Sequence, residues 1–437
     1  MMQRDLGKLV RQGFVGLLAA SQLAGCGGQV PASVDSRVDS ATKITVSNRA
    51  SSSPARVLPE GDWVRHQKSQ PAGEDYQKGY GSLVSAPASG QVYYSDPDRT
   101  NTHIIIITPM GYLVDLACHS KLHVSRNSKV TPLDIIAEEG SDCPKGGGGR
   151  ADESHVHVSV YKPNFATLLR EQQKAKGYVP FLWRSAGLEL FLDNPGKYGM
   201  ADKMFNGDDS INEKILSDAR TRLFRIAEEH PKSLLAMFID EAKKDPDVTF
   251  DQIAMAAYNM WNNKVLGPGL HQKVEDYLRW HLDAPVVLFA PYANPELLKA
   301  GKYRVQGHDP DLTKKLTEKW RPIRDLWDKR RYNEALPPLL EFRKHHSQIS
   351  GTSRENSLGI IFLKDGEYRK SFLHLTLAEA QIGYKPDSVP AETKWRKYWI
   401  NANMSYVLAR LGRTEAEFYL ARSEELKEFK DHVPIRY

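Results

Sequence analysis

The stretch Ser154-His155-Val156-His157-Val158-Ser159-Val160 alternates polar and apolar residues from His155 onward. Successive side chains of a β-strand point to opposite faces of the sheet, so the alternation predicts a strand with His155 and His157 on one face. Two imidazoles on one face fit part of a metal site, in which one ring binds the ion and the other handles a proton. The same pattern also fits two polar residues on the solvent face of an amphipathic strand. Other residues must decide between the two.

Short β-prone runs precede this strand from about residue 63, and turn residues such as Gly81, Gly90 and Gly111 separate them. Many short runs at regular spacing predict an antiparallel sheet or a barrel-like sandwich. The predicted strands cover residues 82–86, 91–94, 103–108, 112–117 and 134–137.

Beyond residue 162 the apolar residues are spaced by three and four, which predicts helices. From about residue 313 a weak internal repeat appears, because Tyr332 and its neighbours recur around Tyr368. This spacing resembles tetratricopeptide repeats, whose period is about 34 residues and whose stacked helix pairs offer a concave surface to a protein partner. A non-repeating helical bundle is the alternative. The predicted helices before the repeat cover residues 165–173, 212–229, 232–244, 250–262 and 272–281.

The first 26 residues are predicted to be an export signal rather than part of the fold, since a basic start precedes an apolar run too short to span a bilayer. Leu23-Ala24-Gly25-Cys26 resembles the lipobox of bacterial lipoproteins, which implies cleavage before Cys26 and lipid attachment to it. Several acyl chains would anchor the protein durably to a membrane. Gly27 replaces the aspartate that retains Gram-negative lipoproteins at the inner membrane, which implies an outer-membrane location facing the periplasm. An ordinary signal peptide that contains a cysteine is the alternative.

Composition limits the remaining choices. The chain has 437 residues, enough for about two or three domains. Its net charge of +6 comes from interspersed acids and bases, which does not indicate nucleic-acid binding. With Cys26 lipidated, Cys118 and Cys143 remain, and an exported compartment favours one disulfide between them. Alternatively, Cys118 is a metal ligand or a nucleophile and Cys143 is a free thiol.

Residues 75–92, DYQKGYGSLVSAPASGQV, resemble the D-x5-G-x-x-V-x-A-P-x-x-G-x-V core of the M23 (LytM, lysostaphin-like) zinc endopeptidases. The resemblance covers about residues 71–161 and ends with the H-x-H strand. It implies a small antiparallel β domain that holds zinc with three protein ligands and leaves one position for water. It also implies histidines beside the metal that manage the proton and stabilise the oxyanion.

The family pattern is an early H-x-x-x-D, a middle H-L pair and a late H-x-H. The resemblance therefore places Asp75 and His157 at metal-ligand positions and His155 at the proton-handling position. Pro71 stands where the first histidine of the pattern is expected. Because proline carries no ligating side-chain atom, the implied set of zinc ligands is incomplete.

The middle of the pattern also departs from the family. Val114-Asp115-Leu116 occupies the place where a histidine should precede the leucine. His119 is nearby, but it shares a face with Asp115 only if the strand continues without a bulge. His66 and His119 are the substitutes that could complete the ligand set, and both would be needed.

An incomplete ligand set favours a degenerate domain that keeps the family fold without its hydrolytic machinery. The leading hypothesis is a cell-envelope lipoprotein that binds peptidoglycan or regulates a separate cell-wall hydrolase, with no cofactor. A zinc endopeptidase that cuts peptidoglycan cross-links, with zinc on Asp75 and His157, is the first alternative. A helical-repeat scaffold for envelope assembly is the second. The sequence thus leaves catalysis open and favours a non-enzyme, with membrane contact through Cys26 and a protein partner on the C-terminal helices.

The predicted fold class is α+β multidomain, with an antiparallel M23-like β domain followed by an all-α, tetratricopeptide-like region. The predicted segments are the signal (1–26), a flexible tether (27–58), the β domain (59–163), a helical region without an assigned role (164–310) and the helical repeats (311–437).

Overall fold

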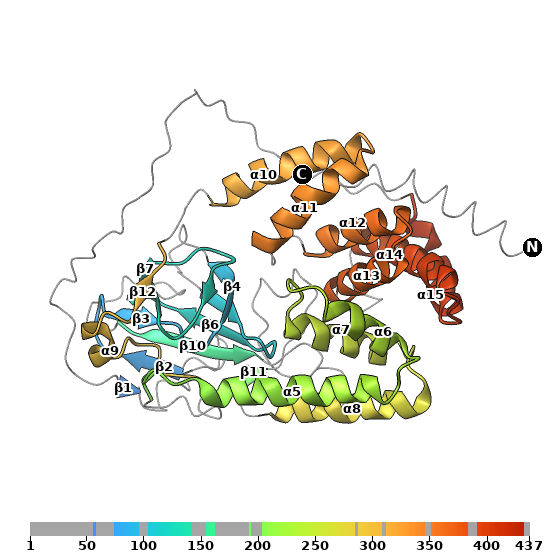
Figure 1. Cartoon of the computed structure of the whole chain (residues 1–437). Helices are drawn as coiled ribbons and strands as arrows, with labels where there is room; N and C mark the ends of the chain where they lie inside the picture. The colour runs from blue at the N-terminus through green and yellow to red at the C-terminus, as the bar shows by residue number, and fades with distance from the viewer. Residues whose placement is uncertain are drawn as a thin grey trace, which may run out of the picture.

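A computed structural model shows a β region followed by a helical region (Figure 1), which confirms the predicted fold class. The predictions for Cys26, the tether, His66, Cys143 and the helix at 165–173 lie outside the residues that the structure describes. The described residues are 56–57, 74–95, 104–140, 154–161, 192–193, 203–284, 287–307, 312–345, 351–382 and 391–431.

The larger sheet places the H-x-H strand between two neighbours of distant sequence. Its strand order is β1-β2-β10-β6-β5-β4-β8, with β11 also paired to β10, and every pair in it is antiparallel. The strands are β1 (Arg56–Val57), β2 (Glu74–Gln77), β4 (Gly90–Ser95), β5 (Ile104–Ile107), β6 (Leu113–Ala117), β8 (Lys129–Val130), β10 (Val156–Tyr161) and β11 (Leu192–Asp193).

A smaller sheet is built around β9 (Asp134–Glu139). β3 (Leu83–Ser85) and β7 (His119–Leu122) pair with it antiparallel, and β12 (Arg304–Val305) pairs with it in parallel. The predicted strands at 82–86, 91–94, 103–108, 112–117 and 134–137 therefore all form, with ends shifted by a few residues. The sequence analysis missed β2 and β7, because neither carries a run of β-branched residues.

The alternation of β10 works as predicted. Val156, Val158 and Val160 are buried in the core of the β region, and burying each such side chain contributes about 1.5–3 kcal/mol. The opposite face of the strand therefore carries His155, His157 and Ser159.

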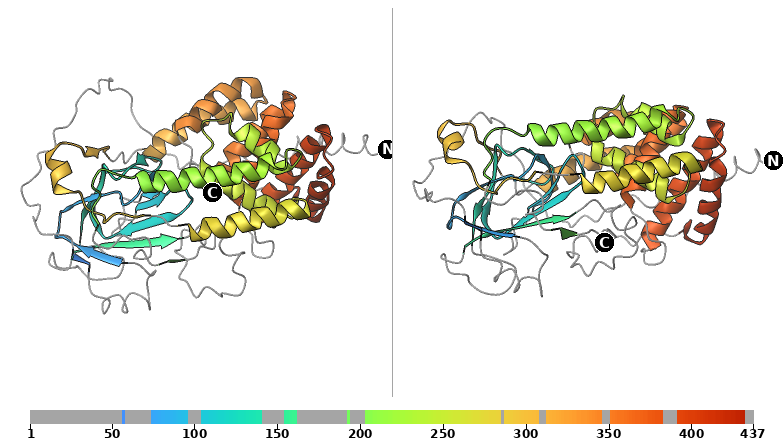
Figure 2. Two further views of the ribbon diagram at one scale, coloured as in Figure 1. Left: turned by 60° about the horizontal axis from the view of Figure 1, so that its bottom comes forward. Right: turned by 90° about the horizontal axis from the view of Figure 1, so that it is seen from below.

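The first four helices of the described helical region pack against one another, each contacting two of the others. They are α5 (Ser210–Glu228), α6 (Leu234–Ala242), α7 (Phe250–Asn262) and α8 (Pro268–Asp283). Capping residues fix where they begin: the Ser233 hydroxyl accepts from the Ala236 amide, Thr249 and Gln252 form a capping box, and Pro268 opens α8. α5 and α8 lie side by side (Figure 2). No helix in this or any other described part is long and apolar enough to cross a bilayer.

The C-terminal helices form three hairpins that share one type of turn. Arg330, Gly366 and Gly412 each adopt a positive φ, of 59°, 77° and 68°. In each turn the next amide bonds to the carbonyl five residues before it, which is a helix-ending motif. The two turns at Arg330 and Gly366 coincide with the repeat seen in the sequence, and the tetratricopeptide assignment stays a prediction. The helices are α10 (Leu312–Asp328), α11 (Tyr332–His345), α12 (Gly351–Lys364), α13 (Tyr368–Ile382), α14 (Ala391–Arg410) and α15 (Ala416–Glu425).

Arg330 occupies a left-handed position that costs a non-glycine residue roughly 1–2 kcal/mol. We expect Arg330→Gly to raise the free energy of unfolding by about 0.5–1 kcal/mol, measured by urea denaturation. Gly366→Ala is the matched opposite change, because a Cβ there meets no atom within 4 Å and only the backbone is strained. A stabilising or neutral Gly366→Ala would show that the turn does not require this conformation.

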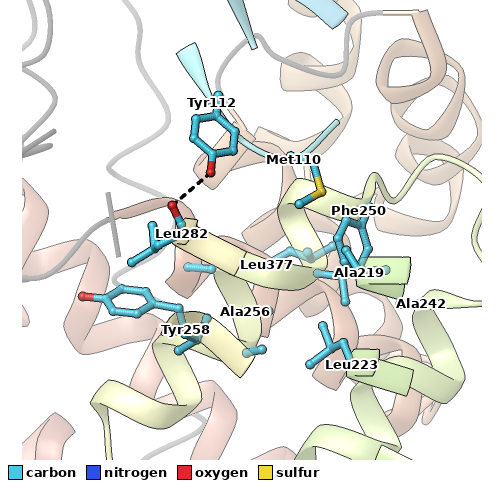
Figure 3. Close-up of a cluster of buried hydrophobic side chains, with 14 of the residues drawn as sticks. Met110, Tyr112, Ala219, Leu223, Ala242, Phe250, Ala256, Tyr258, Leu282 and Leu377 are labelled. Atoms are coloured by element: carbon cyan, nitrogen blue, oxygen red, sulfur yellow. Dashed lines mark hydrogen bonds between the residues drawn. The ribbon is translucent and has the colours of Figure 1, made fainter. Parts of the chain in front are cut away.

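The β region and the helices share one hydrophobic cluster. Figure 3 shows Tyr112, from the turn between β5 and β6, with its hydroxyl directed at Leu282 near the end of α8, while Met110 from the same turn lies beside Phe250. The Tyr112 hydroxyl lies 3.2 Å from the His281 carbonyl oxygen, and His281 Nε2 donates to the Met110 carbonyl at 2.8 Å. The sheet and α8 are thus joined by apolar packing and by reciprocal hydrogen bonds.

After α8 the chain goes back to the β region. We call residues 287–307 the return segment; it contains α9 (Pro295–Lys299) and ends with β12. The Phe289 amide donates to the Pro87 carbonyl at 2.8 Å, and the Ala293 amide donates to the Leu83 carbonyl at 3.2 Å. Part of the predicted helical region of unassigned role therefore completes the smaller sheet.

Candidate functional site

Three neighbouring strands bring the predicted site residues together. In the register of the larger sheet, His157 on β10 lies directly opposite Asp75 on β2 and opposite Ala117 on β6. Directly opposite residues on one face of an antiparallel pair have their Cβ atoms about 4.5–5.5 Å apart. Pairing of β2 with β10 thus brings Asp75 and His157 together although they are far apart in the sequence.

A chain of hydrogen bonds runs through the His157 ring. Nδ1 of His157 lies 2.7 Å from Asp75 Oδ1, and Nε2 lies 3.1 Å from Ser159 Oγ. Because a carboxylate only accepts, Nδ1 carries a proton, and Nε2 forms the second hydrogen bond of the ring, with the Ser159 hydroxyl. Asp75, His157 and Ser159 are 9%, 6% and 0% exposed, so the chain is almost fully buried.

His155 lies at the edge of this chain and is less buried. Its Nε2 is 3.9 Å from Asp75 Oδ1 and 3.6 Å from Cys118 Sγ. Cys118 follows β6 directly and has a φ of 72°, which ends that strand. We call Asp75, His155, His157 and Ser159 the histidine site.

The spacing of the donors differs from what zinc requires. Two ligands at about 2.0–2.1 Å from a tetrahedral ion lie about 3.3 Å apart. The Asp75 and His157 atoms are 2.7 Å apart and bonded directly to each other, while the other His157 nitrogen bonds to Ser159. Within the described residues, no group of three or more His, Cys, Asp or Glu side chains could hold a metal ion. The described donors do not by themselves fit zinc.

The other predicted site residues lie elsewhere. The strand does not continue from Asp115 to His119: β6 ends at Ala117, and His119 begins β7 in the smaller sheet, opposite Glu139. Asp115 is buried on β6 opposite Ser159. His66, a predicted substitute zinc ligand, lies outside the described residues, and so does Cys143, the predicted disulfide partner of Cys118. Both assignments stay predictions.

Ser159 was missed by the sequence analysis although a signal for it existed. It stands two residues after His157 on the same strand face, where its hydroxyl is within reach of the ring. Serine is common on exposed strand faces, so its identity alone indicates no role.

Glu139, at the end of β9, is a second residue that the sequence analysis missed. Its side chain is 0% exposed, and four groups surround it. Oε1 accepts from the Ser154 hydroxyl at 2.7 Å and from the Gly79 amide at 3.0 Å. Oε2 accepts from the Lys78 amide at 3.0 Å and lies 2.7 Å from the Tyr292 hydroxyl. This buried carboxylate therefore joins the turn after β2 to the residue that precedes His155.

Tyr292 reaches this carboxylate from the return segment. Its hydroxyl also lies 2.7 Å from the Tyr76 carbonyl oxygen on β2. Burial first, and then the nearby Glu139 carboxylate, raise the pKa of Tyr292 well above its ordinary value, so the hydroxyl keeps its proton and remains a donor. No local sequence signal could have found Tyr292, since the contact spans 153 residues.

No family model matches this chain, and no curated protein matches it. Among solved structures, the chain is similar to LytU, with 23% identity over 20% of this chain and 59% of that chain, at a TM-score of 0.18. It is similar to a mutant catalytic domain of the prophage-encoded M23 protein EnpA from Enterococcus faecalis, with 21% identity over 20% of this chain and 65% of that one, at 0.17. The antimicrobial peptidase lysostaphin from Staphylococcus simulans matches at 21% identity over 26% of this chain and 43% of that one, at 0.19.

These likenesses concern the fold. The chain spans less than two thirds of each of the three similar structures. The activity of this chain has to be argued from its own site.

Proposed function

We propose that this protein is a cell-envelope lipoprotein whose degenerate M23-like domain binds peptidoglycan or regulates a separate cell-wall hydrolase. The observation that carries this proposal is the direct hydrogen bond between Asp75 and His157. The two side chains that the resemblance assigns to zinc lie 2.7 Å apart and hydrogen-bond to each other. Ser159 Oγ lies 3.1 Å from the remaining ring nitrogen, so both nitrogens of His157 have hydrogen-bond partners.

The proposed absence of a metal has a physical reason in this sequence. Pro71 cannot supply the ligand that the family pattern expects, and each lost ligand removes much of the metal-binding free energy. A buried aspartate without a metal needs another partner, because burying an unpaired charge is costly. The His157 ring, fixed by Ser159, provides that partner.

The envelope location is part of the same proposal. The lipobox-like Leu23-Ala24-Gly25-Cys26 supports a lipid anchor on Cys26, and Gly27 supports the outer membrane facing the periplasm. A disulfide between Cys118 and Cys143 fits that oxidising compartment. Peptidoglycan lies within reach of a protein tethered there.

Convergence of Asp75, His155 and His157 favours one alternative, an active zinc endopeptidase. His155 Nε2 is 3.9 Å from Asp75 Oδ1, so the histidine that the resemblance assigns to proton transfer lies beside a carboxylate that it assigns to the metal. This alternative requires both predicted substitutes, His66 and His119, and His119 pairs opposite Glu139 in the smaller sheet. It also requires that zinc displace the Asp75–His157 hydrogen bond.

Zinc content and cleavage separate the two proposals. We expect the protein without residues 1–26 to purify with far less than one zinc per chain, to sediment with peptidoglycan and to release no soluble peptides from it. Stoichiometric zinc together with cleavage that His157→Ala abolishes would establish the hydrolase instead. His123→Ala is the matched control, since His123 pairs with Glu138 on the smaller sheet, away from the histidine site.

The three C-terminal hairpins support a protein partner as a further part of the proposal. Their shared turn motif favours a tetratricopeptide-like array, and such arrays present extended surfaces to partners. The face of α13 is already covered by α6 and α7 of the same chain. A partner would therefore contact the outer helices of the array, and pulldown of a wall hydrolase would identify it.

A further inference from the structure

All the segments that carry the histidine site meet at Glu139 and its neighbour Gly140. The amides of Lys78 and Gly79, directly after the β2 strand of Asp75, donate to the Glu139 carboxylate. The Gly140 amide donates to the Cys118 carbonyl at 2.9 Å, and the His155 amide donates to the Gly140 carbonyl at 3.2 Å. This cluster therefore sets the spacing of β2, the end of β6 and the start of β10.

Two features show that the cluster tolerates little variation. A Cβ on Gly140 would lie 2.4 Å from the Ser120 amide nitrogen, so only glycine fits there. The Glu139 carboxylate accepts from Lys78, Gly79 and Ser154 and lies within reach of Tyr292, so it has little spare capacity for water. A buried carboxylate with this many partners holds each of them in a fixed place.

Tyr292 is the member of the cluster that comes from outside the M23-like residues. It belongs to the return segment, which follows α8 and pairs with the smaller sheet through β12. Its hydroxyl lies 2.7 Å from both Glu139 and the β2 backbone at Tyr76. Movement of the return segment therefore changes the hydrogen bonding of Glu139 directly.

We propose that Glu139 and Tyr292 are positioning residues, through which the helical region sets the place of His155 in the histidine site. The path runs from Tyr292 to Glu139, from Glu139 to the Ser154 hydroxyl, and from Ser154 to the adjacent His155. The proposal rests on the proposed role of the histidine site. A partner that displaces the return segment would alter that site without touching it.

The test uses the protein without residues 1–26 and the variants Tyr292→Phe and Ser154→Ala. We expect Tyr292→Phe to shift the ring signals of His155 in histidine-labelled NMR spectra. We also expect it to speed hydrogen exchange of the His155 amide about tenfold, the change that loss of one net hydrogen bond produces. Ser154→Ala, which breaks the last link, should shift the same signals. The double variant should add little to either single change.

Tyr303→Phe is the matched control, because Tyr303 lies in the same return segment and its hydroxyl accepts from the Asn294 amide instead. It should leave the His155 ring signals unchanged. Unchanged His155 signals in Tyr292→Phe, or equal shifts in both tyrosine variants, would overturn the proposal. These readouts need no peptidoglycan, so they can succeed or fail independently of the proposed function.

Discussion

Replacing Glu355 with glutamine is expected to lower the free energy of unfolding by about 3–5 kcal/mol, the usual cost of removing one partner from a buried ion pair. Glu355 on α12 is 0% exposed. Its Oε1 accepts from Arg343 Nε at 3.0 Å and from Arg354 Nη2 at 2.9 Å, and its Oε2 lies 2.8 Å from His374 Nδ1. Without the carboxylate, the buried guanidinium groups of Arg343 and Arg354 would lose the negative charge that both of them pair with.

The electrostatics of Glu355 show how strongly its charge is held. Burial by itself raises the pKa of a carboxyl, but the His374 hydrogen bond and the charges of Arg354 and Arg343 together hold the pKa of Glu355 well below its ordinary value. Arg343 also bonds to Asp245, in the connection between α6 and α7, at 2.7 Å. The network therefore fastens α11, α12 and α13 to the earlier helices.

Urea denaturation of the whole chain, followed by circular dichroism, measures this effect. Glu334→Gln is the control, because Glu334 forms an exposed pair with Arg331 that solvent screens, and it should leave the transition unchanged. A Glu355→Gln loss below about 1 kcal/mol would mean that the buried arginines find other partners.

Acidification is expected to remove about 2.5 kcal/mol of stability between pH 7.5 and 4.5 through His281 alone. Burial lowers the pKa of His281 from 6.5 to about 4, even though its hydrogen bond to the Met110 carbonyl acts in the opposite direction. The neutral ring fits its surroundings, because Nε2 donates to Met110 and the Tyr277 hydroxyl lies 3.1 Å from Nδ1.

The sign follows from proton uptake. Between pH 6.5 and 4 the unfolded chain takes up a proton at His281 while the folded chain does not. The free energy of unfolding therefore decreases as the pH falls. The stability contributed by His281 is therefore present above pH 6.5 and declines toward pH 4. His281→Gln keeps a donor for Met110 but cannot titrate, which makes it the comparison.

The measured quantity is the difference in unfolding free energy between the parent protein and His281→Gln at pH 7.5 and at pH 4.5. From pH 7.5 to pH 4.5 the unfolding free energy of the parent protein should fall by about 2.5 kcal/mol relative to that of His281→Gln. A difference that stays constant with pH would mean that the ring already titrates normally in the folded protein.

Local patterns were sufficient for most individual elements. The alternation around His157 placed three valines in the core and two histidines on the other face, as the structure confirms. The apolar spacing of 250–262 coincides with α7, because the capping box at Thr249 starts the helix at that point. These predictions hold because a strand or a helix of that length is decided by its own side chains and by its capping residues.

The candidate site was predictable only in part. Asp75 and His157 were paired from a family resemblance, and the register of β2 against β10 brings them together. His119 could not be placed from sequence, since the positive φ of Cys118 ends β6 and sends the chain into the other sheet. A single residue's backbone conformation decided that outcome.

Residues close together in the chain were enough to specify the order of β and helical regions and the burial of the three valines of β10. The direct bond between Asp75 and His157, the burial of Glu139 among its partners and the approach of Tyr292 from the return segment became known only from the folded arrangement. This difference arises because a buried polar group takes its partner from whichever segment packing brings within hydrogen-bond distance. Distance along the chain carries no information about that choice.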